Sequence, residues 1–143
     1  MLWQFALGAL LIAASVAAHV VFIGAAIHFF SRTGAWFRSP PAAIKTPAGL
    51  AAAALWMMAA HGVAIWFWAI AFMAIGGLED LDTAVYFAAV CFTTLGFGDI
   101  IPDESWRHLT GLCAANGLLA FGVSTAFLVE LLQNIWREER DAV

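Results

Sequence analysis

The sequence is poor in charged residues. Asp, Glu, Lys and Arg make up only 11% of its 143 residues, whereas 64% are hydrophobic and the mean hydropathy is +0.89. Soluble domains are usually about 45–50% apolar and about 25% charged. A chain of this length has no core large enough to hide so much apolar surface from water. The composition excludes a soluble globular protein, a disordered tail and a nucleic-acid binder, and it indicates a single-domain membrane protein.

Cysteines and catalytic motifs are also scarce. Cys91 and Cys113 lie in apolar stretches without metal-ligand spacing, so we interpret them as small buried hydrophobes rather than a disulfide or zinc site. The chain has no HExxH, no GxSxG and no paired intramembrane carboxylates, and we therefore expect no enzyme activity. No helix carries a periodic row of arginines, which excludes voltage sensing of the usual kind.

The first apolar run lacks a Lys or Arg in front of it and continues to Phe30. It is about twice as long as the 7–15-residue core of a signal peptide, so we interpret it as a retained transmembrane helix. Two further uncharged runs, 46–78 and 108–129, reach the roughly 20 residues needed to cross a bilayer. Residues 83–98 are apolar but too short to cross, a length that suits a re-entrant element.

These runs predict an all-α membrane protein with three transmembrane helices and a short re-entrant helix. We expect a first helix over 1–31, a connecting loop over 32–47 and a main domain over 48–136. Within that domain the expected parts are an outer helix (48–77), a short helix (82–93), a segment over 94–99 and an inner helix (107–136). Asp82 is the expected N-cap of the short helix.

The positions of the charges predict the orientation. The 32–47 loop carries Arg32, Arg38 and Lys45 without an acidic residue, which indicates the cytoplasmic side. The N-terminus is then outside and the C-terminus inside the cell membrane. Six of the ten acidic residues fall in the outside segments: Glu79, Asp80, Asp82, Asp99, Asp103 and Glu104.

Residues 93–99 read TTLGFGD, which resembles a potassium-channel filter. A K⁺ ion that leaves water needs several consecutive carbonyls pointing toward one axis, whereas carbonyls alternate along an ordinary strand. Gly96 and Gly98 can enter positive φ at little cost and so turn the carbonyls inward. The Thr94 hydroxyl can add one more oxygen, and Leu95 and Phe97 are expected to pack against the pore helix.

This segment resembles the potassium-channel signature, TTVGYGD in its commonest form, and the similarity to two-helix bacterial potassium channels extends over roughly residues 50–135. Pro102 and Trp106 fall on matching positions after the filter. Leu95 and Phe97 replace the commoner Val and Tyr, and Val90 stands where some relatives carry Glu. The resemblance implies K⁺ binding at Thr94, Leu95, Gly96, Phe97 and Gly98, with support from Thr93, Asp99 and Tyr86. We predict a hydrogen bond between Tyr86 and Asp99.

One filter per chain cannot close a ring, so the resemblance implies a C4 homotetramer in membrane lipid. In its register the inner helix faces the axis through Leu119, Gly122, Ala126 and Glu130. Gly117 or Gly122 could act as a hinge, and for Gly117 we favour close packing instead. Glu130 could form an acidic ring or reach water at the membrane surface. For Asn116 we favour an interhelical hydrogen bond over a position lining the pore.

His19 and His61 should lie at nearly the same depth, because their helices run antiparallel. Ionisable residues in the bilayer suggest function, so this pair could sense pH. We favour the alternative of neutral imidazoles hydrogen-bonded between helices.

The sequence therefore predicts a K⁺-selective channel that needs no cofactor beyond the permeant K⁺ ion and binds no nucleic acid. The competing hypotheses are a non-selective cation channel and a non-conducting membrane partner subunit.

Overall fold

The computed structural model describes residues 2–141, and this part of the chain folds into helices without strands. In chain order the helices are α1 (Leu2–Arg38), α2 (Ala42–Ala74), α3 (Leu81–Phe92), the 3₁₀ turn η1 (Glu104–Trp106) and α4 (Arg107–Asp141). Three segments are long and apolar enough to cross a membrane: Leu2–Gly34, Ile44–Ala74 and Glu104–Asn134. The all-α class is as predicted, and the chain is a multi-pass membrane protein.

The connector between α1 and α2 is much shorter than the loop expected over 32–47. Helix α1 continues to Arg38, and α2 begins at Ala42 with Pro47 inside its second turn. Charged residues mark the membrane edge but do not end a helix, and a proline close to a helix start costs few backbone hydrogen bonds. At 1.5 Å per residue the 37 residues of α1 span about 55 Å, more than the hydrocarbon core needs.

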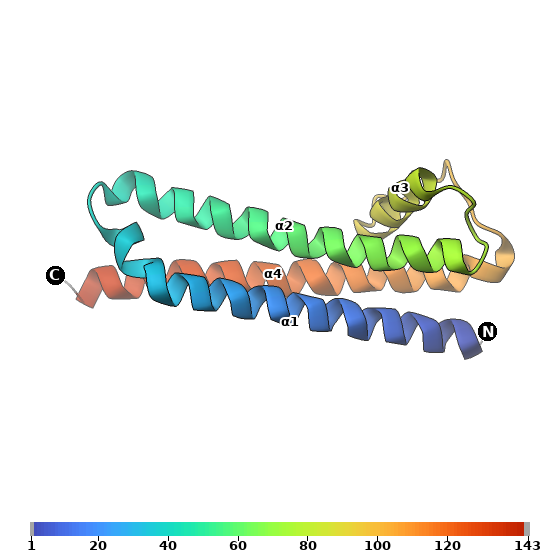
Figure 1. Ribbon diagram of the computed structural model, residues 1–143, viewed down its shortest axis with the longest axis horizontal. Coiled ribbons are helices and arrows are strands. Elements are labelled where there is room, and N and C mark those ends of the chain that lie inside the picture. Colours follow the sequence, from blue (N-terminus) through green and yellow to red (C-terminus); the bar gives the residue numbers. More distant parts are fainter. Residues whose placement is uncertain (1, 142–143) are drawn as a thin grey trace.

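The long helices α1, α2 and α4 run side by side along the molecule, and the two chain ends lie at opposite ends of it (Figure 1). Helix α1 packs against both α2 and α4. Helix α3 lies against α2 and α4 near the end that carries the N-terminus. After α3 the chain returns to that same end before α4 begins (Figure 1).

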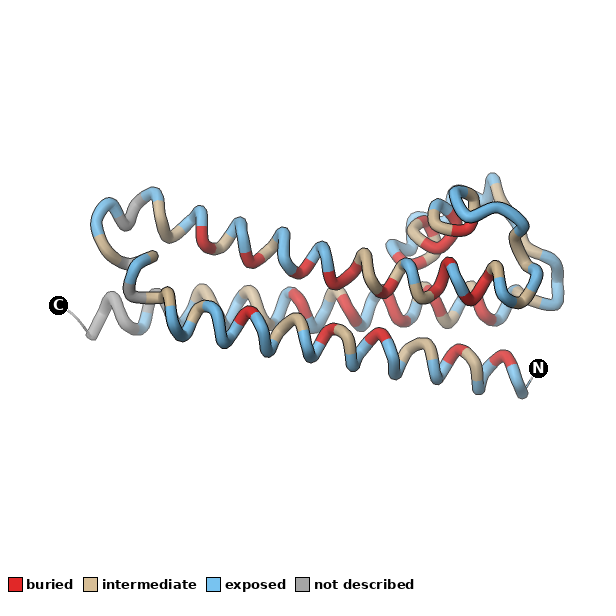
Figure 2. Tube along the Cα trace, viewed as in Figure 1, coloured by how far each residue is buried: buried red, intermediate tan, exposed pale blue. Residues whose placement is uncertain are grey.

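The tightest packing occurs where α2, α3 and α4 meet. Buried residues concentrate in this half of the molecule (Figure 2). Trp68 and Phe72 of α2, Phe92 of α3, and Leu109 and Cys113 of α4 are almost fully buried in one cluster. Phe72 meets Phe87 edge to face, with ring centroids 5.1 Å apart. This core fixes α3, and with it the start of the segment that follows α3.

Helix α1 is tied to the same end of the bundle by its first residues. The Gln4 side chain donates a hydrogen bond to the Ser105 carbonyl. The Trp3 and Trp106 rings meet edge to face with centroids 5.0 Å apart. The additional helix is thus packed onto the beginning of α4 rather than held only by its connector.

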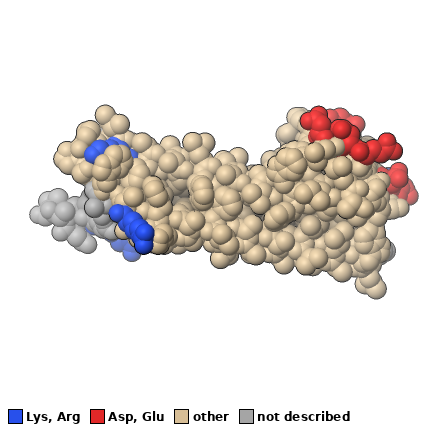
Figure 3. Space-filling model, viewed as in Figure 1, with Lys and Arg blue, Asp and Glu red and all other residues tan. Residues whose placement is uncertain are grey.

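Charge is divided between the two ends of the molecule. On the face shown in Figure 3, acidic residues gather at the end that carries α3 and basic residues at the opposite end, although Arg107 pairs with Glu104 at the acidic end. Arg32 lies near the end of α1 and Lys45 near the start of α2, whereas the side chain of Arg38 lies outside the described residues. The charge separation inferred from the sequence is present along the long axis.

Candidate functional site

Helix α3 begins one residue earlier than expected, and its N-cap is Asp80 rather than Asp82. Asp80 has an extended backbone, and its carboxylate accepts hydrogen bonds from the Thr83 N–H at 2.9 Å and the Thr83 hydroxyl at 3.1 Å. These bonds lower the pKa of Asp80, the backbone bond from Thr83 contributing most. Asp82 lies inside the first turn, where its negative charge complements the helix dipole.

The other end of α3 leads directly into the TTLGFGD segment. The Thr93 hydroxyl donates to the Ala89 carbonyl at 2.8 Å, and the backbone N–H of Leu95 donates to the Val90 carbonyl at 3.0 Å. The Thr94 N–H donates to the Cys91 carbonyl at 2.9 Å. The last turn of α3 therefore holds the first residues of the segment in place.

Three alternate residues of the segment have positive φ: Thr94 at 60°, Gly96 at 57° and Gly98 at 76°. The two glycines behave as predicted, whereas the positive φ of Thr94 was not expected from a residue with a branched side chain. In an ordinary strand the carbonyl groups point to alternate sides. Reversing the sign of φ at every second residue cancels this alternation of carbonyl directions. This backbone pattern can bring successive carbonyl oxygens to one side of the chain.

The segment makes little contact with the rest of its own chain. Residues 93–99 are all exposed, and Leu95 and Phe97 retain 56% and 64% of their accessible surface. The expectation that these two side chains pack against α3 is therefore wrong for a single chain. The reason is that α3 already buries its apolar face against α2 and α4.

The predicted hydrogen bond between Tyr86 and Asp99 is present. The Tyr86 hydroxyl donates to Asp99 Oδ2 at 2.6 Å, while Asp99 Oδ1 accepts from the Ile100 N–H at 3.1 Å. The bond from Tyr86 lowers the pKa of Asp99, and the same bond raises the pKa of Tyr86. The pair connects the middle of α3 to the last residue of the segment.

Gly117 of α4 lies directly beneath the end of α3. A Cβ at this position would overlap the Phe92 carbonyl group. The contact supports the packing interpretation of Gly117, because only glycine lets the two backbones approach so closely. It also fixes the depth at which the TTLGFGD segment starts.

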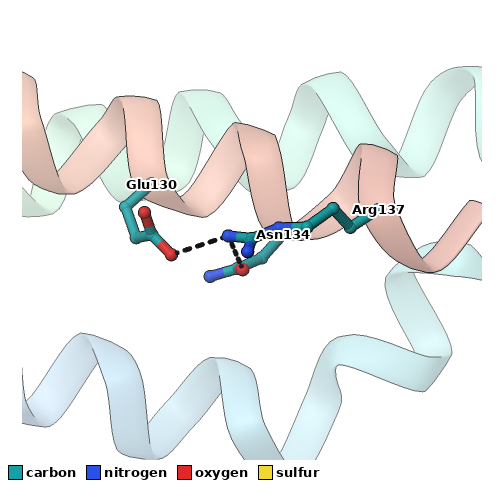
Figure 4. Close-up of polar contacts among 3 residues, drawn as sticks. All are labelled: Glu130, Asn134 and Arg137. Carbon is teal, nitrogen blue, oxygen red and sulfur yellow. Dashed lines mark hydrogen bonds and ion pairs between the residues drawn. The ribbon is translucent and has the colours of Figure 1, made fainter.

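The expected axis-facing residues of α4 lie on a face that the chain itself does not cover. Leu119, Gly122, Ala126 and Glu130 are all exposed. Arg137 donates to Glu130 Oε1 at 3.0 Å and to Asn134 Oδ1 at 2.9 Å (Figure 4). Sequence reasoning missed this ion pair, although the seven-residue spacing places both side chains on one helix face.

His19 and His61 do come together, with ring centroids 5.0 Å apart. Ser124 of α4 lies between them: its Oγ is 3.1 Å from His61 Nε2 and 3.4 Å from His19 Nε2. All three side chains are buried. Ser124 was not predicted from the sequence; the signal that could have identified it is a polar residue of α4 at the depth of the two histidines.

The interhelical hydrogen bond expected for Asn116 is absent. Its side chain is buried, but its amide atoms have no hydrogen-bond partner within residues 2–141. The side chain faces the inside of the single chain, so the weaker alternative of lining a pore is not favoured either. The same described residues contain no cluster of three or more potential metal ligands, and Cys91 and Cys113 are free thiols.

A family model described as "Ion channel" matches residues 60–134, just over half of the chain. This range includes the C-terminal part of α2 from residue 60, all of α3, the TTLGFGD segment and most of α4. Neither the curated proteins nor the solved structures contain a match. The match to residues 60–134 shows that the chain belongs to the two-helix, pore-loop ion channel family, and α1 lies outside the matched range.

Proposed function

We propose that four copies of the chain surround one axis and form a K⁺-selective channel that conducts passively. In this arrangement α3 is the re-entrant pore helix, TTLGFGD is the selectivity filter, and α4 is the inner helix. The permeant K⁺ ion is the only ligand required, and no covalent chemistry takes place. The basic end faces the cytoplasm, which leaves the N-terminus outside and the C-terminus inside.

The observation that carries this proposal is the alternation of positive φ at Thr94, Gly96 and Gly98. Carbonyls of residues 94–97, aligned in this way in four chains, can replace the hydration shell of a K⁺ ion. The Thr93 hydroxyl is already bonded to α3, so we assign the extra hydroxyl ligand to Thr94. Gly98 and Asp99 complete the outer end of the filter.

The surfaces left exposed by a single chain support the assembly. The filter and the α4 face with Leu119, Gly122, Ala126 and Glu130 are both uncovered. Fourfold packing would place the filter against neighbouring subunits and surround the axis with this face. Leu95 and Phe97 would then gain the packing partners that they lack within one chain.

The charge distribution supports conduction of cations. The acidic residues of each chain at the filter end, repeated four times, create a negative potential that raises the local cation concentration. Arg107 pairs with Glu104 at 3.2 Å and so offsets one of these acidic charges in each chain. The C-terminal end of α3, with its partial negative charge, points toward the start of the filter and favours a cation there.

The direct test is K⁺ and Na⁺ flux from purified protein in liposomes, together with the reversal potential in a K⁺/Na⁺ gradient. We expect K⁺ flux and a reversal potential close to that of K⁺. Gly98→Ala should abolish selective flux, because φ of 76° costs an alanine roughly 1–2 kcal/mol per chain. Gly111→Ala is the matched control, since its Cβ also meets open space and Gly111 lies within α4.

The same experiment separates the competing functions. Equal permeability to Na⁺ and K⁺ would identify a non-selective cation channel. Absence of flux from protein that is tetrameric and folded would identify a non-conducting partner subunit. Unchanged selectivity in Gly98→Ala would contradict the assignment of TTLGFGD as the selectivity filter.

A further inference from the structure

Helix α1 buries a face made of small and polar side chains, whereas large apolar side chains such as Leu10 and Val20 stay exposed. The buried residues described for α1 are Gln4, Gly8, Ser15, His19 and Ala26. Lipid tails solvate apolar side chains as well as a neighbouring helix does, so helices in a bilayer associate through close backbone approach and hydrogen bonds. The contacts of this face therefore indicate which part of the bundle α1 binds.

The first two turns of α1 lie against η1 and the start of α4, at the end of the bundle that carries α3 (Figure 1). The pairs in contact are Trp3–Trp106, Gln4–Ser105, Phe5–His108 and Gly8–Leu112. The Phe5 and His108 rings are stacked with centroids 5.8 Å apart, and a Cβ on Gly8 would overlap the Leu112 side chain. Because the partners advance in the same direction along both helices, α1 and α4 run parallel from this end.

The segment 100–106 joins TTLGFGD to α4 and has few hydrogen bonds of its own. Among the described residues, its backbone N–H groups donate at Ile100, to the Asp99 carboxylate at 3.1 Å, and at Trp106, to the Asp103 carbonyl at 2.9 Å. Most of its side chains are exposed. Tyr86 holds Asp99 at the filter side of the segment, so the position of the other side depends on what contacts η1.

Helix α1 supplies that contact at two consecutive residues of η1. The Gln4 side chain donates to the Ser105 carbonyl, and Gln4 is buried, so losing this bond would leave its amide without a partner. The Trp106 ring meets Trp3 of α1 with centroids 5.0 Å apart. Trp106 also lies beside Gly77, in the turn between α2 and α3, where a Cβ would be 3.6 Å from Trp106 Cδ1. The end of the segment is thus held from α1 on one side and from that turn on another.

The close packing of α1 on α4 does not continue along the whole bundle. Near the middle, His19 Nε2 is 3.4 Å from Ser124 Oγ. Beyond that point a cavity of about 340 Å³ lies between α1, α2 and α4, and Phe127 and Leu131 line it from α4. Helix α1 therefore holds the half of α4 that follows TTLGFGD more closely than the half that follows Ser124.

We propose that α1 positions the outer end of the filter by holding the segment 100–106 through Trp3, Gln4 and Gly8. Their described contacts are with η1 and the first turns of α4 rather than with TTLGFGD, so they are positioning residues that act through this segment. The effect on the filter rests on the proposed function, whereas the effect on 100–106 does not. The matched family range begins at residue 60, so this support comes from outside it.

The test is amide hydrogen exchange of the assembled protein in nanodiscs, read by mass spectrometry of the peptides that cover 100–106. In Gln4→Leu, which removes the amide but keeps a side chain of similar size, exchange of this segment should be about five times faster, as expected for one lost hydrogen bond. Gly8→Val, which pushes α1 away from Leu112, should have the same effect. Gly24→Val is the matched control, because a Cβ on Gly24 meets open space on the same helix. Unchanged exchange of α3 separates local loosening from general unfolding.

Variants of Trp3 test the link from this segment to the filter. Trp3→Leu removes the aromatic contact with Trp106 and should make current decay in planar bilayers several-fold faster. Trp3→Phe keeps a ring at this position and should behave as the wild type. Trp36→Leu is the control, because Trp36 is also an exposed tryptophan of α1 but contacts Phe37 and Lys45 near the other end of the helix.

Two outcomes would overturn the proposal. The first is equal exchange of 100–106 in Gln4→Leu, Gly8→Val and the wild type. The second is unchanged current decay in Trp3→Leu, which would limit α1 to packing of the bundle. Absence of conduction in the wild type would overturn the proposed function instead, and the exchange of 100–106 would still decide whether α1 holds this segment.

Discussion

The Tyr86 hydroxyl donates a 2.6 Å hydrogen bond to Asp99, joining the middle of α3 to the last residue of the TTLGFGD segment. Phe97 stands where the commonest form of this segment has a tyrosine, so the filter itself has no phenol hydroxyl. The hydrogen bond from Tyr86 therefore links α3 to the outer end of the segment.

Removing this bond should destabilise the outer end of the filter. In Tyr86→Phe we expect faster or more complete inactivation and little change in ion selectivity, because the variant keeps the ring and removes only the hydroxyl. Current decay in planar bilayers under steady voltage measures the effect. Unchanged conduction and inactivation would show that the bond has no role in holding the filter.

The Tyr86–Asp99 pair also predicts the pH range over which its hydrogen bond stabilises the fold. The pKa of Asp99 is lowered by the bond, so the bond stabilises the fold above about pH 3.9 and is lost as the pH falls through the pKa of folded Asp99. The pKa of Tyr86 is raised, so the bond is fully present below about pH 10 and is lost as the pH rises through the pKa of folded Tyr86.

This prediction can be measured directly, because Tyr86 is the only tyrosine of the chain. Near-ultraviolet absorbance should show the phenol ionising at a higher pH than a free tyrosine. In Asp99→Asn the midpoint should fall toward the ordinary value, since the acceptor loses its charge. A midpoint that does not move in this variant would contradict the assigned cause.

Local patterns explain which parts of the structure could be predicted. Uncharged runs located the three long helices, because each run must match the bilayer thickness. The two glycines of the filter and the Tyr86–Asp99 bond followed from motif spacing. Helix ends were predicted less well: Arg32 and Pro47 were expected to lie in a loop but belong to helices, because neither a surface charge nor an early proline ends a helix.

Contacts that depend on how separate helices align could not be predicted. Ser124 meets both histidines only because three helices bring their side chains to one depth. The positive φ of Thr94 follows from the last turn of α3, not from the residue type. Asn116 looked suited to an interhelical hydrogen bond, but no partner lies opposite it within the described residues.

The close approach at Gly117 predicts a large effect from a single methyl group. Gly117→Ala places a Cβ against the Phe92 carbonyl, which is backbone and cannot rotate away. We expect a loss of about 1–3 kcal/mol in stability, typical of overpacking, together with displacement of α3. Thermal denaturation in detergent measures it, with Gly111→Ala as the control on the same helix.

A hinge at Gly117 would give a different result. If the glycine served only bending of α4, the alanine variant would keep its thermal stability and change its gating alone. Equal denaturation midpoints for Gly117→Ala and Gly111→Ala would therefore count against the packing interpretation.

The three buried side chains His19, His61 and Ser124 allow the structural and pH-sensing interpretations to be separated. The hydrogen-bond contacts described for the two imidazole rings are to Ser124, a neutral group, so no neighbouring carboxylate favours a charged histidine. We therefore expect a structural pair. Ser124→Ala should cost about 1 kcal/mol of stability through the lost hydrogen bonding, and it should weaken the packing of α1 on α4.

K⁺ flux from liposomes across a pH series, compared between wild type and His61→Ala, gives the decisive measurement. A structural pair predicts that both proteins respond to pH in the same way, although the variant should denature at a lower temperature. A sensor predicts that the wild-type response disappears in His61→Ala. Loss of the pH response in a variant that still assembles and conducts would overturn the structural interpretation, because neutral imidazoles have no charge change to transmit.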